Sequence, residues 1–171
     1  MRRVLWVLGA MLAVVSLRAD KKPVQTTRYE DKNLNYSFQP PKDWLRVESL
    51  PSPIVAYKAP MKTGFATNFS VNLHGVQVDP KKETAFLEET KKAYQKEGTM
   101  TPIKQITLGG KPAFTWRVTL KLASAKGLEM RQVLCFYKRR AYELTFTLPI
   151  AQRKTYDPMC DKILNSFQFT K

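Results

Sequence analysis

The chain has 171 residues, which is the size of one ordinary domain. Its 43% hydrophobic and 11% aromatic content is typical of a globular protein and excludes a disordered one. The 29 basic residues outnumber the 14 acidic residues, and this excess favours anionic partners: nucleic acid, acidic lipid headgroups or an acidic protein. Two cysteines are too few for a disulfide framework.

The first 19 residues have the pattern of a signal peptide. Two arginines precede an apolar run over residues 4–17, and Ala19 is a small residue at the expected cleavage point. The run is shorter than the ~20 residues that a spanning helix needs. We therefore expect an exported protein, periplasmic or secreted, with residues 1–19 removed; a short uncleaved anchor is the alternative. Polar residues 20–33 are expected to form a flexible leader to a domain over 34–171.

Short strands and one helix are predicted for the first half of that domain. Residues 34–38 alternate between apolar and polar, and Pro40 and Pro41 end this strand because proline cannot donate to a ladder. Further strands are expected at 44–47, 54–58 and 68–76. Asp79 is a natural N-cap with Pro80 as the first helical residue, and Gly98 is placed where the helix ends.

The second half predicts a meander of long strands and a closing helix. Residues 103–107 lead into Gly109 and Gly110, which suit a tight hairpin turn. Alternation continues through 114–122, 128–136 and 142–148, with short turns between. Asp157 and Pro158 have the order of a cap and a first residue of the last helix. The expected fold class is α+β, with an antiparallel sheet of about six strands flanked by helices.

Large aromatic side chains are expected to fill the core of this domain. Alternation and helical spacing direct five of them inward, with no ligand role: Trp44, Phe114, Trp116, Phe146 and Phe167. Cys135 and Cys160 both fall on apolar sides of their elements. A single bridge in an oxidising compartment and two buried free thiols both remain open, because a bridge requires Cα atoms within ~7 Å.

Three segments in this order resemble the PsbP/DcrB-like family. They are 36–44 (YSFQPPKDW), 108–113 (LGGKPA) and 163–167 (ILNSF), within a resemblance that spans 29–171. The resemblance implies a PsbP-like α/β/α sandwich and a non-enzymatic role as an accessory or binding protein of a membrane-associated or envelope assembly. It transfers no catalytic residue. DcrB-like members often carry a lipid-anchor cysteine after the leader, and this chain has none.

No group of residues has the spacing of an active site, and we expect no catalytic, cofactor or metal site. His74 is the only histidine, and nothing near it in the sequence resembles a nucleophile or an orienting acid. The glycines before Lys111 lack the spacing of a phosphate-binding loop. We expect no enzyme, although an enzyme of unrecognised type stays the third hypothesis.

Basic residues are the one feature beyond a plain domain. The predicted binding face comprises Arg117, Lys121 and Arg131 on neighbouring strands and Lys138, Arg139 and Arg140 at a turn. Aromatic residues that stack bases do not interleave with them, which argues against nucleic acid. We expect a monomer that binds a protein partner or an anionic membrane surface. The alternative is a secreted interaction protein that binds an anionic or host partner, and a solvated surface that serves solubility is the simplest interpretation.

Overall fold

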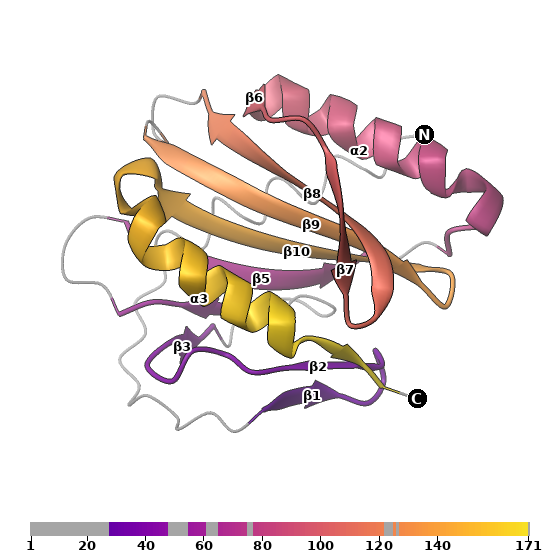
Figure 1. The fold of residues 1–171 in the computed structure, drawn as a ribbon, viewed down its shortest axis with the longest axis horizontal. Helices are drawn as coiled ribbons and strands as arrows, with labels where there is room; N and C mark the ends of the chain where they lie inside the picture. Colours follow the sequence, from indigo (N-terminus) through magenta and orange to yellow (C-terminus); the bar gives the residue numbers. More distant parts are fainter. Residues whose placement is uncertain are drawn as a thin grey trace.

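The computed structural model describes residues 28–47, 55–60, 65–74, 77–121, 125 and 127–170. The predicted signal peptide and the first part of the predicted leader lie outside the described residues. The described chain folds into one large sheet, one small sheet and two helices (Figure 1).

The large sheet has eight strands, all paired antiparallel, where about six were expected. The strand over Gly98–Met100 was not predicted, because three residues show too little alternation, whereas the two-residue strand over Leu45–Arg46 lies within the predicted segment 44–47. The strands in spatial order are β3 (Leu45–Arg46), β4 (Val55–Lys58), β5 (Asn68–Leu73), β10 (Arg140–Pro149), β9 (Leu128–Tyr137), β8 (Lys111–Leu120) and β6 (Gly98–Met100), with β7 (Lys104–Leu108) beside the first half of β8. The three long central strands confirm the predicted meander.

A second, three-stranded sheet joins the two ends of the domain. It consists of β1 (Tyr29–Asp31), β2 (Tyr36–Phe38) and β11 (Gln168–Phe169), with β2 in the centre. Strand β1 precedes Leu34, the residue at which the sequence pattern placed the beginning of the domain. Tyr29 pairs with Phe38 and packs its ring 5.1 Å away, which explains why a polar segment becomes ordered here.

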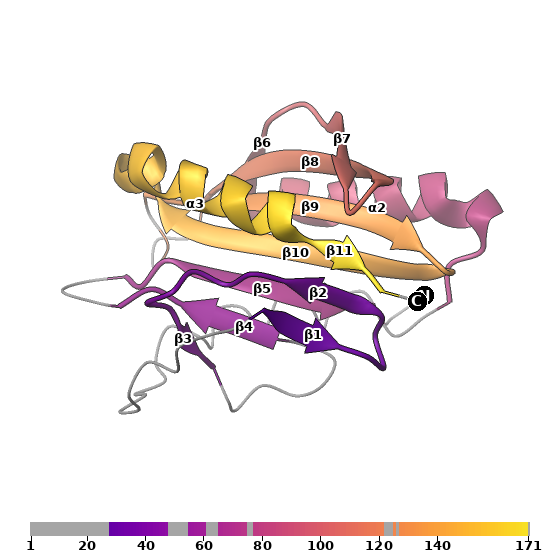
Figure 2. The same ribbon diagram turned by 60° about the horizontal axis from the view of Figure 1, so that its bottom comes forward.

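Helix α3 (Arg153–Ser166) covers one face of the large sheet, as Figure 2 shows. Between them lies a core of aromatic and aliphatic side chains. Phe69 and Phe146 stack at 4.7 Å, and Phe38 meets Phe69 edge to face at 5.1 Å. Trp44, Phe146 and Phe167 are buried here as expected.

Helix α2 (Glu83–Glu97) lies on the opposite face, behind the sheet in Figure 2. A 3₁₀ turn over Pro80–Lys82 leads into α2. Asp79 caps this turn, because its side chain accepts a hydrogen bond from the Lys81 amide at 2.9 Å. Trp116 is buried on this face against Tyr94, with ring centroids 5.8 Å apart. Phe114 is only half-buried, so its assignment to the core interior was wrong.

Gly98 ends α2 as predicted, but for a different reason. Its φ of −176° is extended, so no left-handed cap is formed. A Cβ at this position would lie 2.1 Å from the carbonyl oxygen of Thr119 on the paired strand β8. Close approach of two strands therefore requires a glycine here.

The closing helix begins five residues earlier than predicted. Arg153 is its first residue, after a 3₁₀ turn over Ile150–Gln152, so Asp157 and Pro158 lie inside the helix. The assignment of Asp157 as its cap was wrong, because its carboxylate bonds Arg117 on the sheet. Pro158 is the sixth residue of α3, so the helix lacks the backbone hydrogen bond that this position would donate to the carbonyl four residues earlier.

Candidate functional site

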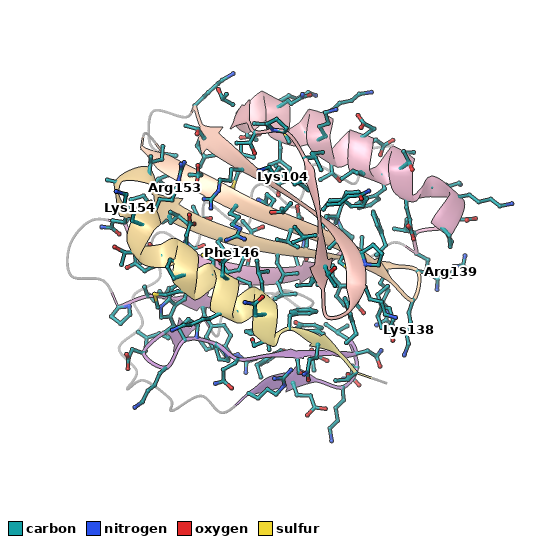
Figure 3. The ribbon with its side chains drawn as sticks, viewed as in Figure 1. Lys104, Lys138, Arg139, Phe146, Arg153 and Lys154 are labelled. Carbon is teal, nitrogen blue, oxygen red and sulfur yellow. The ribbon has the colours of Figure 1, made fainter. Side chains whose placement is uncertain are left out.

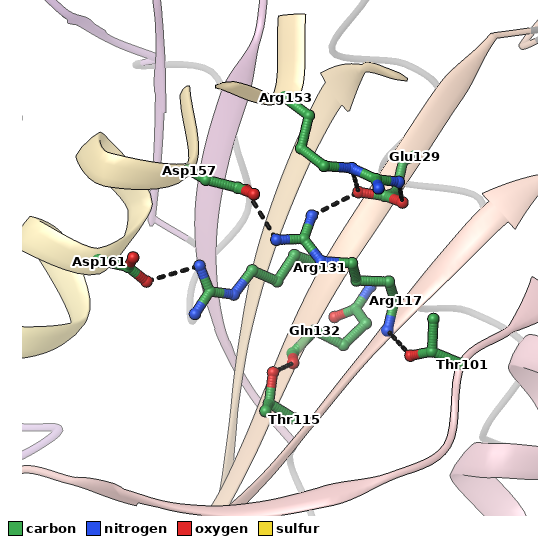
Figure 4. A network of polar contacts seen from close by, with 9 residues as sticks. All are labelled: Thr101, Thr115, Arg117, Glu129, Arg131, Gln132, Arg153, Asp157 and Asp161. Atoms are coloured by element: carbon green, nitrogen blue, oxygen red, sulfur yellow. Dashed lines mark hydrogen bonds and ion pairs between the residues drawn. The ribbon is translucent and has the colours of Figure 1, made fainter. Parts of the chain in front are cut away.

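Three successive turns of α3 pair with charged residues of the sheet (Figure 4). Side chains four residues apart on a helix share one face, so positions 153, 157 and 161 all point towards β8 and β9. The pairs are Arg153 with Glu129, Asp157 with Arg117 at 2.7 Å, and Asp161 with Arg131 at 2.7 Å. This row of ion pairs joins the helix to the edge half of the large sheet.

Glu129 is the buried centre of this row, with 1% of its surface exposed. Its carboxylate accepts hydrogen bonds from the guanidinium groups of both Arg117 and Arg153. Burial by itself would lower the pKa of Arg117, but the hydrogen bonds to Asp157 and Glu129 outweigh it and raise the pKa. Arg117 therefore remains a cation with both terminal nitrogens occupied.

Arg117 and Arg131 lie directly opposite each other in the register of β8 and β9. Two like charges in such a cross-strand pair repel each other. The carboxylates of Glu129, Asp157 and Asp161 compensate for that repulsion. The arrangement is thus a built cluster of charges and not a free cationic face.

A groove of about 590 Å³ opens above these residues, between α3 and the β6–β7 segment. Its polar lining comes from β7, β8, β9 and α3: Lys104, Thr115, Arg117, Arg131, Asp157 and Asp161. We call it the charged groove. Its volume is within the ~300–1,000 Å³ of small-ligand sites.

A second candidate site lies at the hairpin between β9 and β10. Lys138 and Arg139 form its two-residue turn with φ angles of 47° and 60°. Both angles fall in the left-handed region that glycine and asparagine usually occupy in such turns. The ammonium groups of Lys111 and Lys138 each lie 5.4 Å from the centre of the Tyr137 ring. We call Lys111, Lys138, Arg139 and Arg140 the basic tip.

Two neighbouring segments extend this basic surface. The Val78 amide donates to the Arg139 carbonyl at 2.8 Å, which brings the exposed Lys81 and Lys82 towards the hairpin. Arg140 donates to the carbonyl of Asn33 at 3.2 Å. Within the described residues, no side chain of the basic tip is ion-paired with an acid. The basic tip therefore projects uncompensated positive charge.

The six residues of the predicted binding face do not form one surface. Arg117 and Arg131 share a face, as predicted, but they are ion-paired in the charged groove. The three turn residues belong to the basic tip. Lys121 is exposed and follows the end of β8 that is farther from the basic tip. Its backbone amide donates to the carbonyl oxygen of Glu97. Figure 3 shows Lys138 and Arg139 at one end of the molecule and Arg153 and Lys154 at the other.

Sequence reasoning missed the acids that neutralise the groove and one lysine of the basic tip, Lys111. Glu129 was read only as part of a strand, and Asp157 as a cap. One signal was present: Arg153, Asp157 and Asp161 repeat at four-residue spacing, which puts one basic and two acidic side chains on one helical face. No local signal brings Lys111 to Lys138, because they lie on different hairpins.

His74 has an orienting acid that its sequence neighbours did not reveal. Its Nε2 lies 3.0 Å from a carboxylate oxygen of Glu143, which is buried on β10 and also accepts a 2.7 Å hydrogen bond from Tyr94. Burial and the carboxylate raise the pKa of the Tyr94 hydroxyl, so it stays protonated and donates. The ring of Phe86 packs against His74 at 5.1 Å. The cluster ties α2 to β5 and β10.

Cys135 and Cys160 are buried free thiols in the same core cluster. Burial raises the pKa of each thiol to about 12. Nowhere in the described parts of the chain do three His, Cys, Asp or Glu side chains gather as metal ligands would. Across the same residues, no helix has the length and apolar character to cross a membrane.

Solved structures of similar fold come from several bacteria, and none of the curated proteins matches the sequence. A protein from Bacteroides thetaiotaomicron matches with a TM-score of 0.59 and 13% identity over 86% of this chain, which spans only 50% of that protein. Cyanobacterial PsbP from Synechocystis matches with a TM-score of 0.61 and 14% identity over 92% of this chain and 99% of its own. LpqN of Mycobacterium tuberculosis, described as involved in cell envelope biogenesis, matches with a TM-score of 0.57 and 14% identity over 80% of this chain and 83% of its own.

These structures establish the fold. The PsbP family profile matches residues 25–169, which is most of the chain and contains every element described above. The earlier resemblance is thereby confirmed, and the chain belongs to the PsbP family.

Proposed function

We propose that the protein is an exported, non-catalytic binding protein that assists a membrane-associated or envelope assembly and docks on an anionic surface through its basic tip. The uncompensated charge of Lys111, Lys138, Arg139 and Arg140 carries this proposal. Each basic residue close to an anionic membrane is worth ~1 kcal/mol, so four together can hold the domain there at low salt.

The backbone of the turn supports a functional role for the tip. A left-handed conformation costs a residue with a side chain roughly 1–2 kcal/mol, and two adjacent basic residues adopt it here. Selection for stability alone favours asparagine and glycine at these positions. Residues held in strained backbone conformations cluster at active sites and ligand-binding sites.

The contacts of His74 support a non-catalytic protein. Its ring contacts Glu143 and Phe86, and among its described contacts there is no serine, threonine or cysteine that the ring could activate as a base. Both buried thiols are protonated at neutral pH because burial raises their pKa to about 12, and a protonated thiol is a poor nucleophile. The hypothesis of an enzyme is tested by a hydrolase screen with His74→Ala as the control.

Export is supported by the apolar run over residues 4–17 and by the envelope role given for LpqN. N-terminal sequencing of protein from its native host tests it. A mature chain that begins near Asp20 is the expected result. An intact Met1 on soluble cytoplasmic protein contradicts export.

Cosedimentation with lipid vesicles tests the docking surface. Residues 20–171 are used, so that membrane binding through the apolar run of residues 4–17 does not contribute. We expect binding that requires anionic lipid and weakens as salt shortens the Debye length from ~10 Å at 0.1 M to ~3 Å at 1 M. Lys138→Glu with Arg140→Glu should abolish it. The control, Lys121→Glu with Lys154→Glu, makes the same charge change at exposed positions at the other end of the molecule and should retain binding.

Equal loss in both double variants, or binding that salt does not weaken, contradicts docking through the basic tip. A secreted protein that binds an acidic or host protein through the same tip is the alternative. Affinity capture from native envelopes, followed by mass spectrometry, distinguishes the two. Components of one envelope assembly, lost with the tip variant but kept with the control, support the first.

A further inference from the structure

The charged groove differs in its chemistry from the basic tip. Four basic side chains contribute to the groove and its ion pairs: Lys104, Arg117, Arg131 and Arg153. Three acids do so: Glu129, Asp157 and Asp161. One positive charge therefore has no counterion in the groove, and a ligand with one negative charge completes the balance.

The two arginines on the groove floor differ in how firmly they are held. Arg117 bonds two carboxylates, one of them almost fully buried, and its backbone amide donates to the Thr101 hydroxyl at 2.9 Å. Arg131 bonds Asp161 through a single terminal nitrogen, and the Asp161 side chain is 54% exposed. Exposed ion pairs of this kind contribute ~0–1 kcal/mol. Asp161 is therefore a partner that a competing anion can replace.

Arg131 itself cannot leave the groove as easily as Asp161. Only 16% of its side chain is exposed, and its position in β9 is fixed by pairing with both β8 and β10. A guanidinium group has five N–H donors in a planar fork that matches a carboxylate. Among the described contacts, only one donor of Arg131 has a protein acceptor. The remaining donors can bind a ligand in the groove.

Lys104 supplies the unmatched positive charge. It begins β7, the edge strand that pairs only with β8, and it lines the groove on the side opposite α3. Its ammonium group is exposed and has no acidic partner among the described residues. An anion on Arg131 therefore has a second cation on the facing wall.

We propose that the charged groove binds a carboxylate-bearing ligand whose carboxylate replaces Asp161 on Arg131 and is also attracted by Lys104. Asp161 identifies the chemical group, because its own carboxylate already occupies Arg131. The groove volume of about 590 Å³ accommodates a small organic acid or the last residues of a peptide with a free C-terminal carboxylate. This site does not depend on docking through the basic tip.

Titration of the full-length protein, followed by the Nε–H signal of Arg131 in ¹H–¹⁵N NMR spectra, tests the site. The probes are benzoate, a short peptide ending in a free carboxylate, and the same peptide with an amidated end. Asp161→Asn removes the internal competitor and should tighten carboxylate binding at least threefold. Lys104→Gln, an exposed change in an edge strand, should weaken it at least threefold.

A matched control separates this effect from a general change of charge. Glu88→Gln also removes one acid that pairs with a basic side chain on a helix, but it lies on α2, across the sheet. It should leave carboxylate binding unchanged. The amidated peptide should not bind, and the Lys138→Glu with Arg140→Glu variant should bind as the unaltered protein does.

The outcomes identify the ligand source or overturn the site. Binding of benzoate points to small organic acids, and binding of the peptide acid without benzoate points to peptide C-termini. The proposal is contradicted if neither benzoate nor the peptide acid shifts the Arg131 signal, both in the unaltered protein and in the Asp161→Asn variant. It is also overturned if Asp161→Asn and Glu88→Gln change the affinity equally.

Discussion

The charged groove and the basic tip use the same residue types in opposite ways. In the groove, the buried carboxylate of Glu129 and two aspartates of α3 hold three arginines in place. At the tip, four basic residues project from two hairpins without an acidic partner in the described structure. Net positive charge alone therefore does not locate a binding surface. A basic residue attracts an anionic partner only where no acidic side chain compensates its charge.

Among the substitutions that test this comparison, loss of Glu129 should lower the free energy of unfolding the most. Glu129→Ala leaves Arg117 and Arg153 without their shared carboxylate. The cost should reach up to ~3 kcal/mol, because the two arginine side chains stay 22% and 43% exposed and Arg117 keeps Asp157. Urea unfolding measures the loss. Glu129→Gln keeps an acceptor and should be milder. A loss below that of an ordinary surface substitution in both variants means that the row of ion pairs does not stabilise the fold.

The two thiols report on the two regions separately. Cys160 lies on α3 between Asp157 and Asp161, whereas Cys135 bonds the Pro112 carbonyl near the tip. Because burial raises both thiol pKa values to about 12, neither should react with a thiol reagent at pH 8 in the folded protein. Glu129→Ala should speed the labelling of Cys160 more than that of Cys135. Equal acceleration indicates global opening instead of local loosening at the groove.

The raised pKa values of the same two thiols predict a loss of stability at alkaline pH. Folding raises their pKa from an ordinary value near 9.0 to about 12, so the folded state favours the protonated form. This contribution is complete below pH 9 and is lost as the pH rises towards 12. Thermal unfolding between these limits should show a falling melting temperature. Replacing both cysteines with alanine should flatten that slope.

A glycine-containing turn should separate stability from docking at the tip. Lys138→Asn with Arg139→Gly suits the left-handed turn and should raise stability by about 1 kcal/mol, while it removes two charges. Thermal unfolding and vesicle cosedimentation measure the two effects. A variant that is more stable and binds vesicles less supports strain retained for function. Unchanged stability argues that the turn residues are not strained.

Loss of Asp161 should have the smallest effect on stability. Its side chain is 54% exposed, and a surface ion pair contributes ~0–1 kcal/mol. Asp161→Ala should therefore lower the free energy of unfolding by less than 1 kcal/mol, measured under the same conditions as Glu129→Ala. A loss as large as that of Glu129→Ala means that Asp161 is a structural partner of Arg131 and not an exchangeable one.

The predicted elements show where pattern reading succeeds. Alternation located the long strands β8, β9 and β10, and the Asp79–Pro80 pair located the approach to α2. These features are local, since each depends on residues within a few positions of one another. The three-residue strand β6 was missed because so short a segment carries no period, whereas β3 lies within the strand predicted at 44–47.

The sequence by itself determined the class of fold, the face on which each long-strand residue lies, and the excess of positive charge. Alternation decides the face because successive side chains of a strand point to opposite sides. Only the tertiary structure decided which charges are free. Asp157 meets Arg117 across 40 positions, and Glu143 meets His74 across 69. Compensation of a charge depends on distance in space, which antiparallel pairing and helix docking set, and no local pattern encodes it.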